Sequence, residues 1–310
     1  MHGEVHARQS HGGVHPFLTV QGKFIGGILP VRADEAGALD EHAGGAAGGI
    51  EDASVKGGED FDQQPDDGGG LQFMSGRPAY DHGHIPSAGF ADLTGDLSDH
   101  DSSLDLALPT PEQFCSAMGA LGVGPDSRVV LYDGGLSMWM LRWVGFDRAA
   151  ILDGGLGVWT TEGRSLSTDP ATPHARHLIP APRPELIADR DEVLAAIDGG
   201  TVRLLDAMPE AHYRGEMALF ARPGHVPGAS NLSAFELVDG SGRYRPHDEL
   251  AAMVDGDRDA RTITYCGVGA MASSAAFVMA RLGFTDVGVY AASLQEWAAD
   301  PANPLSVEDL

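Results

Sequence analysis

Three blocks of this 310-residue chain occur twice, in the same order and at similar spacing. The pairs are, in chain order, GHIPSA (83–88) with GHVPGA (224–229), RVVLY (128–132) with RTITY (261–265), and 145–159 with 283–297, at offsets of 141, 133 and 138 residues. Blocks that recur in a fixed order indicate a duplicated structural unit. A length of 310 residues also exceeds the usual size of a single core. We therefore expect two copies of one domain.

A proline-rich stretch separates the two copies. Residues 161–184 contain five prolines and no sustained hydrophobic period, which predicts a linker that crosses the surface. This places the first domain at 77–160 and the second at 185–310.

The N-terminal region, residues 1–76, differs from both copies. Residues 33–70 contain ten glycines and eleven acidic residues against one lysine, so we expect this acidic segment to be disordered. Before it, residues 24–31 (FIGGILPV) form the only early run that could make a strand, one that could join the first domain. Pro30 within this run predicts a sheet edge or a strand end.

Each copy alternates between strand-like and helix-like patterns. In the second copy the predicted helices are 189–197, 247–254, 272–282 and 294–299, and the predicted strands are 202–205, 262–265 and 287–290. This order predicts an α/β fold in which each domain is a mainly parallel sheet flanked by helices. Functional groups in such sheets collect at the carboxyl ends of the strands.

The charge of the chain excludes some partners. There are 45 acidic and 20 basic side chains, a formal charge of −25, of which −10 falls in residues 33–70. We therefore expect binding neither to nucleic acid nor to an anionic membrane surface. Two cysteines and no apolar run of about 18 residues predict a cytoplasmic protein. Four histidines near the start are interpreted as part of a mobile terminus rather than a metal site: His2, His6, His11 and His15.

Cys266 has the sequence context of a nucleophile. It follows the predicted strand 262–265 and precedes two glycines, Gly267 and Gly269, and a helix start. Backbone N–H groups of such a loop, together with the helix dipole, favour a thiolate. Cys115 lies in an amphipathic helical stretch and is expected to be an ordinary buried side chain.

Two thiolate chemistries use a loop of this kind. A cysteine phosphatase or arsenate reductase needs an arginine six positions after the cysteine to bind the tetrahedral oxyanion. That position is Ala272, and residues 267–280 contain no arginine. A loop of N–H donors still suits a cysteine that carries one extra sulfur as a persulfide.

The chain resembles the two-domain rhodaneses, which include thiosulfate and 3-mercaptopyruvate sulfurtransferases. The resemblance covers about three quarters of the chain and rests on YDHGHIPSA (80–88), DAMPEAHYRGE (206–216) with GHVPGA, the Cys266 loop, and SLQEW (293–297). It implies tandem rhodanese-like domains with a silent first copy, where Asp133 stands in the place of Cys266. It also implies that Cys266 takes sulfur from a small anionic donor and passes it to cyanide or to a thiol, such as thioredoxin or a small thiol. No metal or organic cofactor is implied. The persulfide would lie within the loop formed by Gly267, Val268, Gly269, Ala270 and Met271.

Several positions depart from the family pattern. Family members usually carry arginines where this chain has Met208 and His212, whereas Arg214 remains. Thiosulfate enzymes favour Lys, and mercaptopyruvate enzymes Ser, at the position of Val268. Arg214, His212 and Arg222 are the candidate donor-binding residues. These departures leave open an alternative, a weakly active or inactive module that carries sulfur or binds a partner.

Other repeated residues are interpreted as structural. His84 and His225 of the two GH-aliphatic-P motifs are expected to pack and hydrogen-bond, and Trp159 and Trp297 to anchor cores. The first copy is also five residues shorter after its strand, which predicts a helix shortened by nearly a turn and a half.

Overall fold

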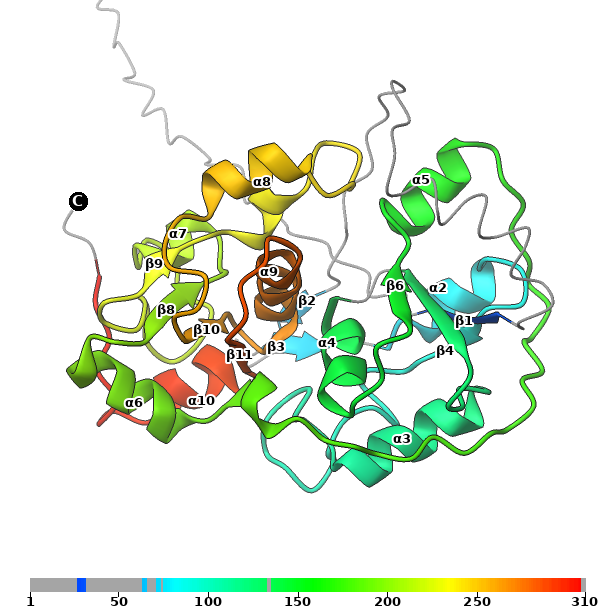
Figure 1. Ribbon diagram of the computed structural model, residues 1–310, viewed down its shortest axis with the longest axis horizontal. Coiled ribbons are helices and arrows are strands. Elements are labelled where there is room, and N and C mark those ends of the chain that lie inside the picture. The colour runs from blue at the N-terminus through cyan, green and yellow to red at the C-terminus, as the bar shows by residue number, and fades with distance from the viewer. Residues whose placement is uncertain (1–26, 32–62, 66–70, 74, 133–134, 308–310) are drawn as a thin grey trace, which may run out of the picture.

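The computed structural model describes residues 27–31, 63–65, 71–73, 75–132 and 135–307. Two α/β units lie side by side, the first on the right of Figure 1 and the second on the left. The His-rich start lies outside the described residues, as does most of the acidic segment predicted to be disordered. The described part of that segment is β2 (Gln63–Pro65), which pairs in antiparallel fashion with β3 (Leu71–Phe73), directly after the segment.

The second unit contains a five-stranded sheet in which every pairing is parallel. Its strands, in spatial order, are β7 (Ile187–Ala188), β11 (Val287–Tyr290), β10 (Thr262–Tyr265), β8 (Arg203–Asp206) and β9 (Ser230–Asn231). All residues of β10 and β11 are buried, as expected for strands covered on both faces. The α-helices of this unit are α6 (Arg190–Gly199), α7 (Glu210–Tyr213), α8 (His247–Met253), α9 (Ala270–Arg281) and α10 (Ser293–Ala299). The predicted α/β fold is confirmed.

The first unit contains a four-stranded sheet in the order β4-β1-β5-β6. Its strands are β4 (Gly89–Phe90), β1 (Gly27–Val31), β5 (Arg128–Tyr132) and β6 (Ala149–Ile151). The pair β5–β6 is parallel, whereas β1 runs antiparallel to both of its neighbours. On one side of β1, strand β4 pairs only with Gly27 and Ile28, so Pro30 of β1 lies beyond the residues that β4 pairs with. The helices of this unit are α2 (Arg77–His82), α3 (Pro111–Ala120), α4 (Gly135–Trp143) and α5 (Gly155–Thr161).

The duplicated GH-aliphatic-P motif forms the same arrangement in both units. His84 stacks on Tyr80 at 3.9 Å between ring centroids, and His225 stacks on Tyr213 at 3.8 Å. In each pair His Nδ1 bonds the tyrosine carbonyl oxygen, at 2.9 and 2.7 Å. Both histidines are therefore held by packing and hydrogen bonds.

The repeated tryptophans differ in burial. Trp297 is fully buried in the second core, whereas Trp159 is half-buried and bonds the carbonyl of Ser165. Trp297 is thus the core anchor that the repeat predicts, and Trp159 packs at the margin of a small cluster.

The five-residue deficit of the first copy is shared between a helix and a loop. Helix α4 has 9 residues and α9 has 12, so the helix is three residues shorter and not five. The other two are missing from the segment before the helix, which is 133–134 in the first copy and 266–269 in the second. The expected loss of nearly a turn and a half is therefore less than one turn of helix.

The two units meet along α4 and α9, which lie side by side at the centre of Figure 1. The contact is close, because a Cβ on Gly135 would lie 3.4 Å from the Cβ of Ser274. Each unit also gives a buried residue to the other's core. Trp139 of α4 packs in the second core and donates to the Leu186 carbonyl at 2.8 Å, and Ala270 packs in the first. The two units therefore share an apolar interface.

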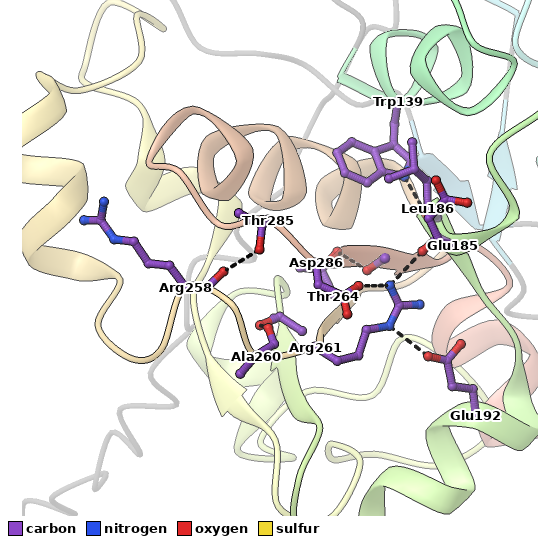
Figure 2. A network of polar contacts seen from close by, with 12 residues as sticks. Trp139, Glu185, Leu186, Glu192, Arg258, Ala260, Arg261, Thr264, Thr285 and Asp286 are labelled. Atoms are coloured by element: carbon purple, nitrogen blue, oxygen red, sulfur yellow. Dashed lines mark hydrogen bonds and ion pairs between the residues drawn. The ribbon is translucent and has the colours of Figure 1, made fainter.

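An arginine holds the amino end of β10 in place. Arg261 donates to Glu192 of α6 and to Asp286 before β11, both at 2.9 Å, and to the carbonyl of Glu185 at 2.7 Å (Figure 2). The guanidinium thus links three segments around the strand whose other end carries Cys266.

The segment 168–183 has no helix or strand and packs along the first unit. Leu178 is buried in the first core, and the N–H of Arg176 bonds the Gly119 carbonyl at 2.8 Å. Among the helices that the structure describes, none combines the length and apolar character needed to cross a bilayer.

Candidate active site

Cys266 lies directly after β10 and four residues before α9 begins. Its Sγ accepts a hydrogen bond from the N–H of Gly269 at 3.2 Å, so the loop curls back over the sulfur. Gly269 has a φ of +88°, and a Cβ there would lie 2.8 Å from the Ala291 carbonyl oxygen. Glycine is therefore required at this position of the loop.

Burial of the thiol corrects one expectation. Cys266 is fully buried, and this desolvation raises the pKa of its thiol, whereas the sequence context predicted a lowered pKa. The N–H groups of Ala272, Val268 and Gly269 oppose the shift without reversing it. The loop geometry was predicted, but the depth of the sulfur was not. The resting thiol is consequently neutral at physiological pH.

Ser293, the first residue of α10, supports the loop and was not among the predicted site residues. Its hydroxyl accepts the N–H of Cys266 at 3.1 Å and donates to the Tyr290 carbonyl at 2.7 Å. Its φ of +54° is unusual for a residue other than glycine. The aligned residue of the first copy is Gly155, with a φ of +53°, and that Ser–Gly pair is the signal that could have identified the position.

Apolar side chains cover the loop. A Cβ on Gly267 would lie 3.3 Å from the Phe220 ring and 3.5 Å from Leu219, so these two side chains close over the loop. Val268 is almost fully buried. Ala270 and Met271, expected in the loop, form the first turn of α9, and Ala270 packs into the first domain.

The candidate donor-binding residues on α7 lie in different environments. His212 is half-buried, and burial lowers the pKa of its imidazole, so it is mostly neutral near pH 7. Its Nδ1 has no hydrogen-bond partner among the described residues. Arg214 is exposed and pairs with Glu210 at 3.1 Å and with Glu216 at 3.9 Å. Arg214 is therefore the candidate that keeps a full positive charge.

Arg222 is bonded to the C-terminal segment. Its guanidinium donates to four backbone carbonyls of the C-terminal segment, at distances of 2.6 to 3.0 Å. The acceptors are Trp297, Ala298, Asp300 and Asn303. Because these bonds engage every nitrogen of the guanidinium, we expect a structural role for Arg222 in place of the predicted contact with an anionic donor.

A buried carboxyl group lies beside the nucleophile and was also missed. Asp206 ends β8, is fully buried, and raises the pKa of the Cys266 thiol through its charge. The sequence placed Asp206 at a strand end but gave no sign of its burial. Cys115, in contrast, is buried in α3, where burial and Glu112 raise the pKa of its thiol to about 11.

Comparison with known proteins identifies relatives over most of the chain. The profile of a family described as Rhodanese-like domain matches residues 189–300. A 3-mercaptopyruvate sulfurtransferase of Escherichia coli O157:H7 is 35% identical over 241 residues, covering 73% of this chain and 85% of that protein. A thiosulfate sulfurtransferase of Azotobacter vinelandii is 30% identical over 237 residues, covering 74% and 87%.

Solved structures show the same fold. The crystal structure of SseA from Escherichia coli, described as a 3-mercaptopyruvate sulfotransferase with a rhodanese fold, aligns with a TM-score of 0.62 and 35% identity. The alignment covers 69% of this chain and 84% of that one. An anaerobic ergothioneine biosynthesis enzyme from Chlorobium limicola aligns with a TM-score of 0.67 at 24% identity. That alignment covers 76% of this chain and 63% of the larger enzyme.

Proposed function

The chain belongs to the rhodanese family of sulfurtransferases, and we propose that it transfers sulfur through a persulfide on Cys266. The observation that carries this proposal is the loop itself. The Cys266 sulfur accepts a backbone N–H at 3.2 Å, and residues 267–280 offer no arginine for a phosphate or arsenate. A compact ring of N–H donors suits one extra sulfur atom with a small charge.

The reaction has two half-steps. In the first, the Cys266 thiolate attacks the sulfur of the donor, an S–S bond forms, and the bond between that sulfur and the rest of the donor breaks. The electron pair leaves with the departing group, as sulfite from thiosulfate or as the enolate of pyruvate from 3-mercaptopyruvate; the enolate then takes up a proton. In the second, an acceptor attacks the outer sulfur and releases the Cys266 thiolate. No external oxidant or reductant is needed.

Between these donors we propose 3-mercaptopyruvate. The loop is lined by Val268 and covered by Leu219 and Phe220, so a donor must give up hydration to reach the sulfur. Desolvation costs more for a dianion such as thiosulfate than for a keto acid with one carboxylate. Arg214 supplies one positive charge for that carboxylate, and Met208 and neutral His212 supply none.

The proposed acceptors are cyanide and thiols, including a small thiol or a thioredoxin. Both classes react at the outer sulfur of a persulfide. In this proposal the Cys266 sulfur is the inner atom, bonded by the Gly269 N–H within a loop bonded to Ser293, so the outer sulfur is the atom that an acceptor attacks.

Single-turnover loading tests the donor. Protein is mixed with a slight excess of either donor, and release of pyruvate or sulfite is followed in time. Faster loading from 3-mercaptopyruvate, with no product from Cys266→Ser, supports the proposal. Faster loading from thiosulfate overturns the choice of donor. If neither donor loads folded protein, the protein is instead the sulfur-carrying or partner-binding module that the departures at Met208, His212 and Val268 left open.

A further inference from the structure

A buried acidic side chain is built into the strand beside the nucleophile. In the parallel pairing of β8 with β10, Asp206 is the register partner of Tyr265, the residue before Cys266. The backbone locks this arrangement, because the N–H of Ala207 bonds the Tyr265 carbonyl at 2.8 Å. The carbonyl of Asp206 accepts from Leu232 and Asn231. Asp206 is therefore held at the carboxyl end of the sheet, next to the reactive loop.

The two oxygens of the Asp206 carboxyl group differ in their hydrogen bonds. Oδ1 accepts the N–H of Met208 at 2.8 Å, whereas Oδ2 has no hydrogen-bond partner among the described residues. The side chain is fully buried, and its chain neighbours Leu205 and Ala207 both belong to the second apolar core. An ionised carboxylate is costly in such surroundings. Burial raises the pKa of Asp206 to about 7, although the Met208 N–H and the Tyr265 side chain favour the ion.

Few other ionisable groups face this carboxyl. Tyr265 of β10 is fully buried, and burial and Asp206 hold its pKa well above the usual range, so it stays neutral. Tyr213 of α7 acts on Tyr265 in the same direction. Cys266 also interacts with this carboxyl, because a negative charge on Asp206 disfavours the Cys266 thiolate. The ionisation of Asp206 and that of Cys266 therefore oppose each other.

We propose that Asp206 is a positioning residue that acts on sulfur transfer through its charge: as a neutral acid it permits the Cys266 thiolate, and as a carboxylate it suppresses it. This inference rests on the proposed function of Cys266. Asp206 exchanges no atom or electron with the donor. Below neutral pH it is uncharged, and the only negative charge formed at the site is the thiolate. Above neutral pH its carboxylate repels both the thiolate and the anionic donor.

Alkylation of Cys266 by iodoacetamide, measured from pH 5 to pH 10, tests this without requiring turnover. The measurement uses the Cys115→Ser background, so that only Cys266 reports. The logarithm of the rate normally rises with a slope of one below the thiol pKa. Coupling between the ionisation of Asp206 and that of Cys266 predicts a shoulder near pH 7 in the wild-type profile, where Asp206 ionises.

In Asp206→Asn the shoulder disappears, and alkylation at pH 8 becomes about tenfold faster, the effect of a change of one unit in the pKa of the thiol. Asp255→Asn, an exposed acid paired with Arg203, is the matched control and leaves the profile unchanged.

Two results overturn the proposal. One is a wild-type profile that rises with a single slope through pH 7. The other is a folded Asp206→Asn protein whose profile superimposes on the wild type. If Asp206→Asn does not fold, the wild-type profile alone decides. Because alkylation reports the thiolate and not sulfur transfer, a normal shoulder with no sulfur loading would contradict the proposed function and leave the coupling intact.

Discussion

The hydroxyl of Ser293 accepts the backbone N–H of Cys266 at 3.1 Å and donates to the carbonyl of Tyr290 at 2.7 Å. One buried side chain thus ties the end of β11 to the start of the nucleophile loop. The left-handed backbone of Ser293, matched by Gly155 in the first copy, shows that the chain keeps this turn in both domains. In the second domain a serine occupies it and serves the site.

Removal of this hydroxyl is expected to destabilise the protein and loosen the loop. Ser293→Ala loses two buried hydrogen bonds, a cost of about 2 kcal/mol in the free energy of unfolding. Urea unfolding measures this loss, and the rate of Cys266 alkylation reports the loop. Ser233→Ala, a buried serine outside the loop, is the control. Unchanged stability together with unchanged alkylation would show that the two bonds contribute nothing.

Opening the apolar cover is expected to expose the nucleophile. Phe220→Ala removes the ring nearest Gly267. Loss of about 1.4 kcal/mol of packing would raise the population of open states, and with it the alkylation rate of Cys266, about tenfold. Phe235→Ala removes a partly exposed ring elsewhere and should leave the rate unchanged. Equal rates in the two variants would mean that Phe220 does not control access.

Much of the fold follows from the sequence because periodicity and repetition are local properties. The strand 262–265 and the position of Cys266 at its carboxyl end were both predicted. The depth at which a side chain is buried depends on residues that are far away in the sequence. The raised pKa of the Cys266 thiol comes from its full burial, and Leu219 and Phe220 approach its loop from a segment without regular structure. A pattern of residues around the cysteine contains no information on that approach.

Dependence on tertiary contacts also explains why the sequence did not distinguish the environments of two arginines. Arg222 and Arg214 look alike in sequence, as cations between α7 and the repeated GH motif. Only tertiary structure shows that four carbonyls of the C-terminal segment take up Arg222. The role of Asp206 was hidden for a similar reason, since its unpaired oxygen is a property of its neighbours.

Substitution of Arg222 should therefore affect stability and not donor affinity. Arg222→Ala leaves four carbonyls without their donor and is expected to lower the free energy of unfolding by about 3 kcal/mol. KM for the donor in the folded fraction should match the wild type. Arg148→Ala, at an exposed pair 3.9 Å from Asp126, should change stability by less than about 0.5 kcal/mol. A raised KM with unaltered stability would restore Arg222 as a donor ligand.

Asp206 should make stability fall as pH rises. The folded protein holds this proton up to a pKa of about 7, whereas the unfolded chain releases it near 3.8, so the folded state binds more protons between these values. The contribution of Asp206 is therefore present below about pH 4 and is lost as pH rises through 7, by on the order of 4 kcal/mol. Chemical unfolding of wild type and Asp206→Asn at pH 4 and pH 8 measures it. A stability difference between the two proteins that is equal at both pH values would contradict this account.

The most direct test of sulfur transfer through Cys266 is the intact mass of the protein after incubation with 3-mercaptopyruvate or thiosulfate. The mass is measured for wild type, Cys266→Ser and Cys115→Ser. Wild type and Cys115→Ser should each gain one sulfur atom that cyanide removes, and Cys266→Ser should gain none. Folded wild-type protein that gains no sulfur from either donor, or a gain that persists in Cys266→Ser, would contradict sulfur transfer through Cys266.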